Sequence, residues 1–186
     1  TPMGPRLFPS TQARNIIEQM VRTGAISGPN ADAWLKKLAD EKEVKELRAK
    51  AEGGDAAAMY HLGRWYFTGD MGLSKDLKQA TGWWQRGYEL GHATCTSELG
   101  LCYARGEGVE KEGAHAACLY GIAAARGSES GCFRLAHSFA NGLNGLPMNA
   151  REATRWFRAM ESATTRRKTD HIRDKAAKWL SEHAME

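Results

Sequence analysis

The sequence predicts an all-α protein, built as an α/α solenoid of about three helix pairs with helical caps at both ends. A pattern of small and apolar residues recurs in three copies, at steps of 37 and 36 residues. Each copy holds two segments with apolar residues at helical spacing. β-Branched residues are scattered and never alternate, so no strand is predicted. The recurring positions are Gly54, Gly91 and Gly127; Leu62, Leu99 and Leu135; Gly69, Gly106 and Gly142; and the pairs Trp83-Trp84, Leu119-Tyr120 and Trp156-Phe157.

Composition limits the classes of function. The chain has 186 residues and a net charge of +4, with acidic and basic residues interleaved, so its charge does not by itself require a nucleic-acid partner. No apolar run approaches the roughly 18 residues of a membrane span, and no signal-peptide pattern opens the chain. Four cysteines are too few and too irregular for a disulfide-stapled fold. We therefore expect an intracellular, cytoplasmic protein without a membrane partner. The chain starts at Thr1 rather than Met, which indicates a fragment.

The two ends of the array are expected to be capped, because each repeat of a solenoid buries its apolar face only on its neighbours. Residues 1–40 are expected to form a partly flexible helical extension, with helices over 10–22 and 30–39, which either caps the array or forms a separate arm. Asp40 and Glu43 fit a capping box that would open a capping half repeat over 41–54. At the other end, residues 165–186 are expected to hold a capping helix over 170–183.

The three repeats are expected at 55–90, 91–126 and 127–164. In the first, one helix is predicted over 55–68 and a second over 74–90, with Gly54 and its equivalents at helix ends. Gly63 and Gly100 fall inside a helix, where glycine costs about 1 kcal/mol relative to alanine. We interpret them as positions that let the second helix of the pair approach closely.

The stretch "ELGLCYARGEGVEKE", residues 98–112, is interpreted as the turn of a repeat and not as a phosphate-binding loop. A phosphate loop follows a strand and carries a Gly-Lys-Ser/Thr ending. This stretch follows a predicted helix, lacks that ending, and is echoed by "GDMGLSKD" and "GLNGLPMN" in the other two copies. Leu73, Val109 and Leu146 are expected to fill the space under the three turns.

At these residues the chain resembles the Sel-1-like repeat family, short relatives of the tetratricopeptide solenoids. The resemblance rests on "GDAAAMYHLGRWYFTGDMGL", "ELGLCYARGEGV" and "ATRWF" and covers about residues 44–164. The third copy departs most from the pattern, at Glu129, Gly131 and Ala136. The resemblance implies a right-handed α/α superhelix that serves as an adaptor in protein complexes, without catalysis as the norm.

A candidate binding surface follows the first helix of each repeat. Four offsets from the repeated leucine share one stripe opposite the core, and the resemblance implies that these helices line the concave face of the superhelix. Their mixed polar, charged and apolar character suits an extended peptide of a protein partner; a solvated helix face is the alternative. Three of the four offsets, one residue before and two and six residues after the leucine, give the candidate groove residues: His61, Arg64 and Thr68; Glu98, Leu101 and Arg105; and Arg134, His137 and Asn141.

No cofactor or metal is predicted. Cys95, Cys102 and Cys132 fall at buried positions of the repeat and are expected to be small core residues. His115 and Cys118 lie one helical turn apart, but two ligands do not make a zinc site.

Two other functions stay open at this point. A hydrolytic enzyme would need a cluster of titratable groups, for which His61, Glu98, Arg134 and His137 are the candidates. Binding of nucleic acid, which the mild net charge does not favour, would use the basic C-terminal region: Arg151, Arg155, Arg158 and residues 166–168.

Overall fold

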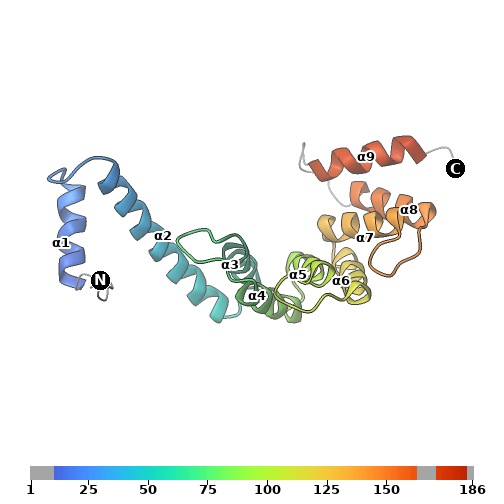
Figure 1. Ribbon diagram of the computed structural model, residues 1–186, viewed down its shortest axis with the longest axis horizontal. Coiled ribbons are helices and arrows are strands. Elements are labelled where there is room, and N and C mark those ends of the chain that lie inside the picture. Colours follow the sequence, from blue (N-terminus) through green and yellow to red (C-terminus); the bar gives the residue numbers. More distant parts are fainter. Residues whose placement is uncertain (1–10, 163–170, 184–186) are drawn as a thin grey trace, which may run out of the picture. The chain divides into compact units, whose positions relative to one another are not determined.

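The computed structural model describes residues 11–162 and 171–183, and within them it contains nine α-helices and no strand (Figure 1). The chain divides into two compact units, residues 1–46 and 47–186. The predicted all-α class is confirmed. No helix in these two ranges combines the length and the apolar character needed to cross a bilayer.

The first unit holds α1 (Thr11–Arg22) and most of α2 (Pro29–Glu52). Arg14 of α1 is paired with Glu41 of α2. The helix start expected at Asp40 is wrong, because α2 runs without interruption through that residue. Residues 30–52 contain no glycine or proline and are rich in Ala, Leu, Lys and Glu, so nothing in the backbone ends the helix there. Pro29 is the first residue of α2, and its lack of a backbone N–H costs nothing there because the first N–H groups of a helix have no partner within the helix.

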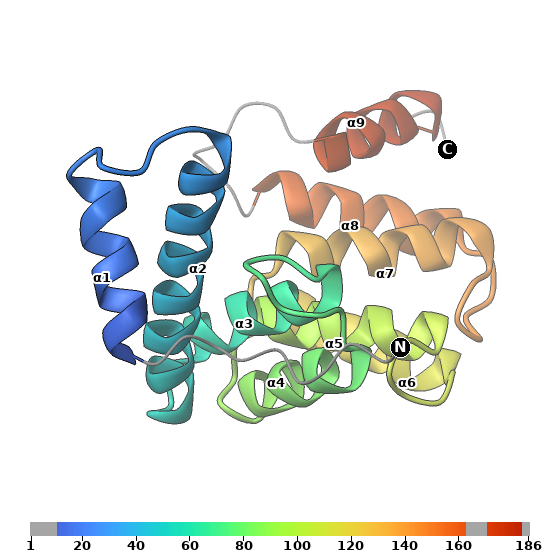
Figure 2. The same cartoon turned by 60° about the vertical axis from the view of Figure 1, so that its left-hand side comes forward.

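The second unit contains three antiparallel helix pairs, stacked one after another (Figure 2). The pairs are α3 (Ala56–Thr68) with α4 (Leu77–Glu89), α5 (Ala93–Arg105) with α6 (Gly113–Ala125), and α7 (Glu129–Asn141) with α8 (Ala150–Ser162). A last helix, α9 (His171–His183), packs against α8 and α7. The helix expected over 170–183 is therefore present at the end of the stack.

Helix ends repeat with the same register as the core. Asp55, His92 and Ser128 cap α3, α5 and α7, each accepting a hydrogen bond from a backbone N–H of the first turn. Asn149 accepts one from the N–H of Glu152, at 3.1 Å, at the start of α8. At the other end, Gly69, Gly106 and Gly142 take left-handed conformations and end the same three helices.

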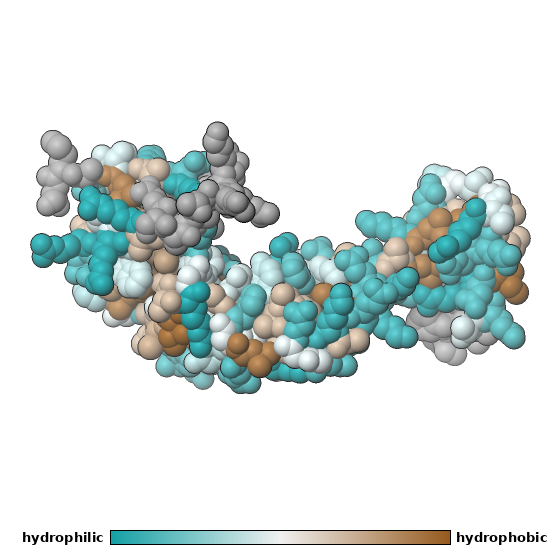
Figure 3. Space-filling view, turned by 180° about the vertical axis from the view of Figure 1, so that it is seen from behind, coloured by the Kyte–Doolittle hydropathy of each residue, from teal (hydrophilic) through white to brown (hydrophobic). Residues whose placement is uncertain are grey.

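The core runs along the inside of the stack, between the helices of each pair and between neighbouring pairs. Trp84, Leu99 and Leu119 share one cluster that joins the first and second repeats. Phe157 and Met160 of α8 share another with Ala176 of α9, so the last helix covers the apolar end of the third repeat. On the surface, polar side chains cover most of the repeats on the face that Figure 3 shows, with isolated apolar ones between them.

Candidate binding pocket

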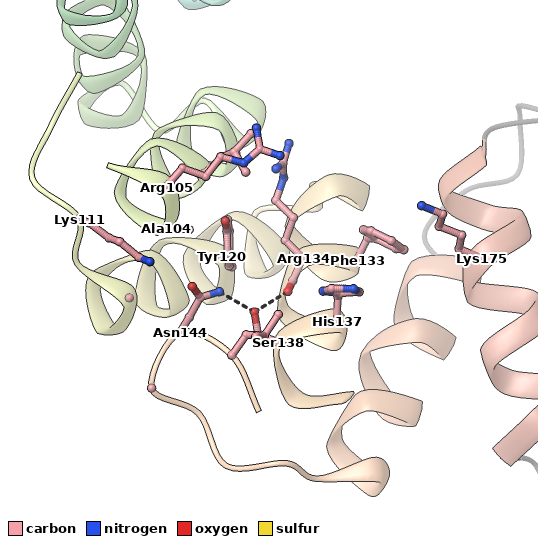
Figure 4. Close-up of a pocket in the computed structure, with 14 residues that line it drawn as sticks. Ala104, Arg105, Lys111, Tyr120, Phe133, Arg134, His137, Ser138, Asn144 and Lys175 are labelled. Atoms are coloured by element: carbon pink, nitrogen blue, oxygen red, sulfur yellow. Dashed lines mark hydrogen bonds between the residues drawn. The ribbon is translucent and has the colours of Figure 1, made fainter. Parts of the chain in front are cut away.

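A pocket of about 630 Å³ opens on the second and third repeats (Figure 4). Helices α5, α6 and α7 form its wall, and α9 contributes one residue. The turns between α5 and α6 and between α7 and α8 close its edge. Its volume lies within the usual range for a ligand site. The residues that line it are Leu101, Ala104, Arg105, Lys111, Gly113, Tyr120, Phe133, Arg134, His137, Ser138, Leu143, Asn144, Gly145 and Lys175.

Four of the nine predicted groove residues meet in this pocket: Leu101 and Arg105 from α5, and Arg134 and His137 from α7. Glu98 contacts Arg134. The other four predicted residues are exposed but do not line the pocket: His61, Arg64 and Thr68 of α3 and Asn141 of α7.

Glu98 and Arg134 join the first helices of the second and third repeats. The Arg134 Nη2 atom donates to both carboxylate oxygens of Glu98, at 3.0 and 3.3 Å. The side chain of Arg134 is 23% exposed and that of Glu98 is 18% exposed. Such a charge-assisted pair fixes the guanidinium at the pocket wall. A similar pair, Arg173 with Glu129 at 2.9 Å, links α9 to the start of α7.

Tyr120 and the α7–α8 turn complete the pocket. Burial raises the pKa of the Tyr120 hydroxyl, and the nearby Arg134 guanidinium opposes that rise, so the hydroxyl is neutral at physiological pH. Ser138 Oγ donates to the carbonyl of Arg134 and accepts from Asn144 Nδ2, both at 2.8 Å. Asn144 has a positive φ of 56°, and its bond to Ser138 holds this turn against α7 (Figure 4).

At the ends of the stripe, two predicted groove residues use their polar atoms locally. Thr68 Oγ1 donates to the carbonyl of Arg64 at 2.9 Å and contacts Asp70 at 2.6 Å. Asn141 Nδ2 donates to the carbonyl of His137 at 2.9 Å. Both side chains thus have roles at helix ends, in addition to any part in binding.

The sequence reasoning missed Lys111, Tyr120, Phe133, Asn144 and Lys175. The predicted stripe contains only residues on one face of the first helices. Lys111 and Asn144 lie on turns, Tyr120 lies on the second helix α6, Phe133 lies beside the stripe on α7, and Lys175 lies on α9. One available signal was the recurring turn register, which places Lys111 two residues after Val109 and therefore next to the first helix of its repeat.

The cysteines behave as core residues where the sequence predicted it. Cys95, Cys102 and Cys132 are buried, so the prediction that they are core residues is confirmed. Cys118 is exposed. Burial raises the pKa of Cys95 and of Cys102 to about 12, so neither is a thiolate nucleophile at neutral pH. His115 stacks on the ring of Tyr103, with centroids 4.2 Å apart. Within the described residues, no three His, Cys, Asp or Glu side chains are grouped as metal ligands.

The residues considered for hydrolysis come together only in part, and they form no nucleophile–base pair. His137 and Arg134 share the pocket, His61 lies on α3 outside it, and Glu98 is engaged by Arg134. Ser138, the hydroxyl beside His137 in sequence, donates to a backbone carbonyl, so it is not aligned with a base.

The basic residues considered for nucleic acid lie on or beyond α8. Arg151 and Arg158 are exposed. Arg155 contacts Glu152 at 3.6 Å and lies over the ring of Trp156. Residues 166–168 are outside the described part of the chain.

Comparison with known proteins agrees with this architecture. Two curated relatives from Arabidopsis thaliana are the ERAD-associated E3 ubiquitin-protein ligase components HRD3A and HRD3B. The chain is 35% identical to the first over 80 residues, 42% of this chain, and 32% identical to the second over 127 residues, 67% of this chain. These matches span 12% and 20% of the length of the two relatives.

Two solved bacterial structures have a similar fold. A protective antigen of uropathogenic Escherichia coli with an SLR fold is 30% identical, with a TM-score of 0.60 over 76% of this chain and 32% of its own. A Sel1 repeat protein from Oxalobacter formigenes is 26% identical, with a TM-score of 0.61 over 76% of this chain and 98% of its own.

The Sel1 repeat pattern itself matches residues 56–92, 94–128 and 130–160, which coincide with the three helix pairs. These matches cover more than half of the chain and confirm the resemblance noted from the sequence. The chain belongs to the Sel1 repeat family.

Proposed function

We propose that this chain is a protein-interaction scaffold, which takes up a peptide or protein segment along the first helices of its repeats and contributes no chemistry of its own. The observation that carries the proposal is the pocket on the second and third repeats, where polar and apolar groups from three helices, two turns and α9 line one hollow. The two plant relatives are named as components of a ubiquitin ligase, so they work within assemblies of proteins.

The chemistry of the pocket supports binding rather than catalysis. Its guanidinium from Arg134 is paired with Glu98, and its hydroxyl from Ser138 is engaged by Asn144 and a backbone carbonyl. A hydrolase that uses a serine nucleophile needs the hydroxyl to donate to a base, whereas Ser138 donates to a backbone carbonyl. The intracellular location expected from the sequence stays a prediction.

The proposal can be tested by capture of partners from a lysate of the source organism. The groove variant is Arg64→Ala/Arg105→Ala/His137→Ala, because all three side chains are exposed and none holds two repeats together. We expect it to melt as the parent does but to lose specific partners, identified by mass spectrometry. Glu98 and Arg134 are left intact, since removing either leaves a largely buried charge unpaired.

The matched control is Lys78→Ala/Gln79→Ala/Arg151→Ala. It also removes three exposed polar side chains, two of which are a Lys and an Arg, but from the second helices α4 and α8. Partners lost only in the groove variant support the proposal. Loss of the same partners from both variants, or retention by both, contradicts it.

A further inference from the structure

Cationic side chains reach the pocket from α5, from the α5–α6 turn, from α7 and from α9. Five of its lining residues carry a positive charge or gain one on protonation: Arg105, Lys111, Arg134, His137 and Lys175. No Asp or Glu is among the described residues that line it. A hollow lined by charges of one sign concentrates ligands of the opposite sign.

The two lysines among these residues differ from the two arginines in having no ion-pair partner in the described part of the chain. Arg134 is paired with Glu98, and Arg105 contacts Glu107 at 3.8 Å. Lys111 and Lys175 make no ion pair with any residue in the described ranges, and both side chains are exposed. Their charges are therefore available to a ligand.

The two lysines approach from opposite sides. Lys111 projects from the turn between α5 and α6, and Lys175 projects from α9, with Tyr120, Ser138 and His137 between them (Figure 4). Because the two lysines reach the pocket from opposite sides, the arrangement suits an extended ligand better than a single compact anion such as phosphate. Several carboxylates along an extended segment match the arrangement better.

Part of the floor between the lysines is apolar. Leu101, Ala104, Phe133 and the ring of Tyr120 provide it, and Leu143, which is 42% exposed, lies at the rim. Phe133 is held in place by Phe157 behind it, with ring centroids 6.0 Å apart. An apolar side chain of a ligand would bury surface here, at about 25 cal/mol per Å² of apolar area removed from water.

We propose that the pocket selects an acidic peptide segment of a protein partner, in which an apolar residue on the floor is flanked by Asp or Glu residues that pair with Lys111 and Lys175. The inference rests on the proposed scaffold function and specifies its ligand. Asn144, anchored through Ser138, stands at the edge as a polar partner for the peptide backbone.

The test begins with a selection of random dodecapeptides displayed on phage against the whole chain. We expect the recovered peptides to be enriched in Asp and Glu around an apolar residue. Affinity of the leading synthetic peptide is then measured by fluorescence anisotropy, for the parent and for Lys111→Ala/Lys175→Ala. We expect this double variant to bind about tenfold more weakly, and binding by the parent to weaken as salt is raised.

A matched control is built into the repeat. Lys75 occupies in the first repeat the register of Lys111, 36 residues earlier, and Lys178 lies one turn after Lys175 on α9. Neither lines the pocket. Lys75→Ala/Lys178→Ala therefore removes the same charge, and we expect it to bind the peptide as the parent does. Equal losses in both double variants would overturn the proposal, because they would show a general charge effect.

The other outcomes separate this inference from the scaffold function. The selection could instead recover neutral or basic peptides whose binding is lost in His61→Ala/Arg64→Ala but kept in Lys111→Ala/Lys175→Ala. That result would overturn the proposal of an acidic ligand and leave the scaffold proposal standing. A selection that yields no groove-dependent peptide would count against both. Displacement of the acidic peptide by an oligouridylate RNA of equal charge, at equal concentration, would overturn the proposal in favour of nucleic acid.

Discussion

The indole of Trp84 lies directly against the backbone of Gly63, so that the second helix of the first repeat touches the first helix where a side chain is missing. A methyl group at Gly63 would sit 2.4 Å from Nε1 of Trp84. The same nitrogen donates to the carbonyl of Tyr60 at 3.2 Å. The second repeat repeats this contact, with the Tyr120 ring against Gly100. The glycines thus set the close approach of the helices within the first two pairs.

Gly63→Ala is expected to destabilise the fold by about 1–3 kcal/mol, the usual effect of overfilling a packed core. The indole must move, and its bond to Tyr60 is then weakened. The control is Gly121→Ala in α6, where an added methyl meets no atom within 4 Å. This change should stabilise the fold by about 1 kcal/mol through helix propensity. Urea unfolding measures both, and shifts in the same direction would contradict the packing argument.

Trp83→Ala is expected to lower the free energy of unfolding by about 3–5 kcal/mol, since a large buried side chain would leave a cavity. Trp83 is 9% exposed and packs in one cluster with Met59, Leu62 and Ala51. Trp83→Phe keeps an aromatic ring in the site and should lose much less. A shift well under 1 kcal/mol for the alanine variant in urea would argue against this stacking of helices.

Glu112→Asp is expected to stabilise the chain by about 1 kcal/mol, because α6 begins without a side-chain cap. Glu112 has φ and ψ of −143° and 96°, and its equivalent Asp76 has −142° and 100° and caps α4 through two backbone N–H groups. The exchange loses only the exposed contact of Glu112 with His115. Asp76→Glu is the reciprocal control and should lose a similar amount. Thermal unfolding compares the two variants with the parent.

His92 is expected to make stability depend on pH. Its Nδ1 atom accepts from the N–H of Cys95 at 3.2 Å and caps α5. Burial lowers its pKa from 6.5; Asp55 opposes this shift and His61 adds to it. The unfolded chain therefore takes up the proton first, so the stabilisation is complete above pH 6.5 and is lost as the pH falls below it.

The measurement is the Tm of the parent and of His92→Ser at pH 7.5 and pH 5. Ser128 caps α7 at the same register, accepting from the N–H of Gly131, so serine should restore the cap without a titrating group. The drop in Tm on acidification should be smaller in the variant. An equal drop in both proteins would assign the pH dependence to other groups.

Much of the fold follows from local chemistry that repeats along the chain. The glycine and leucine registers predicted the three helix pairs, and α3 begins and ends within one residue of the predicted range. The capping box predicted at Asp40 is wrong, because Asp40 and Glu43 can stand in the middle of a long helix as well as at a helix start. Only the structure, in which α2 is continuous from Pro29 to Glu52, distinguishes a helix start from a position inside a helix.

The sequence by itself determined the family, the presence of three helix pairs and the small residues at which helices touch, since these depend on spacing within one repeat. It also placed Leu101, Arg105, Arg134 and His137 on one stripe. Only the tertiary structure decided that Lys111 and Lys175, 64 residues apart, line the same pocket. Their shared position at the pocket depends on how successive helix pairs stack and on where α9 packs. These are properties of the assembled core, and the spacing of residues along the chain does not predict them.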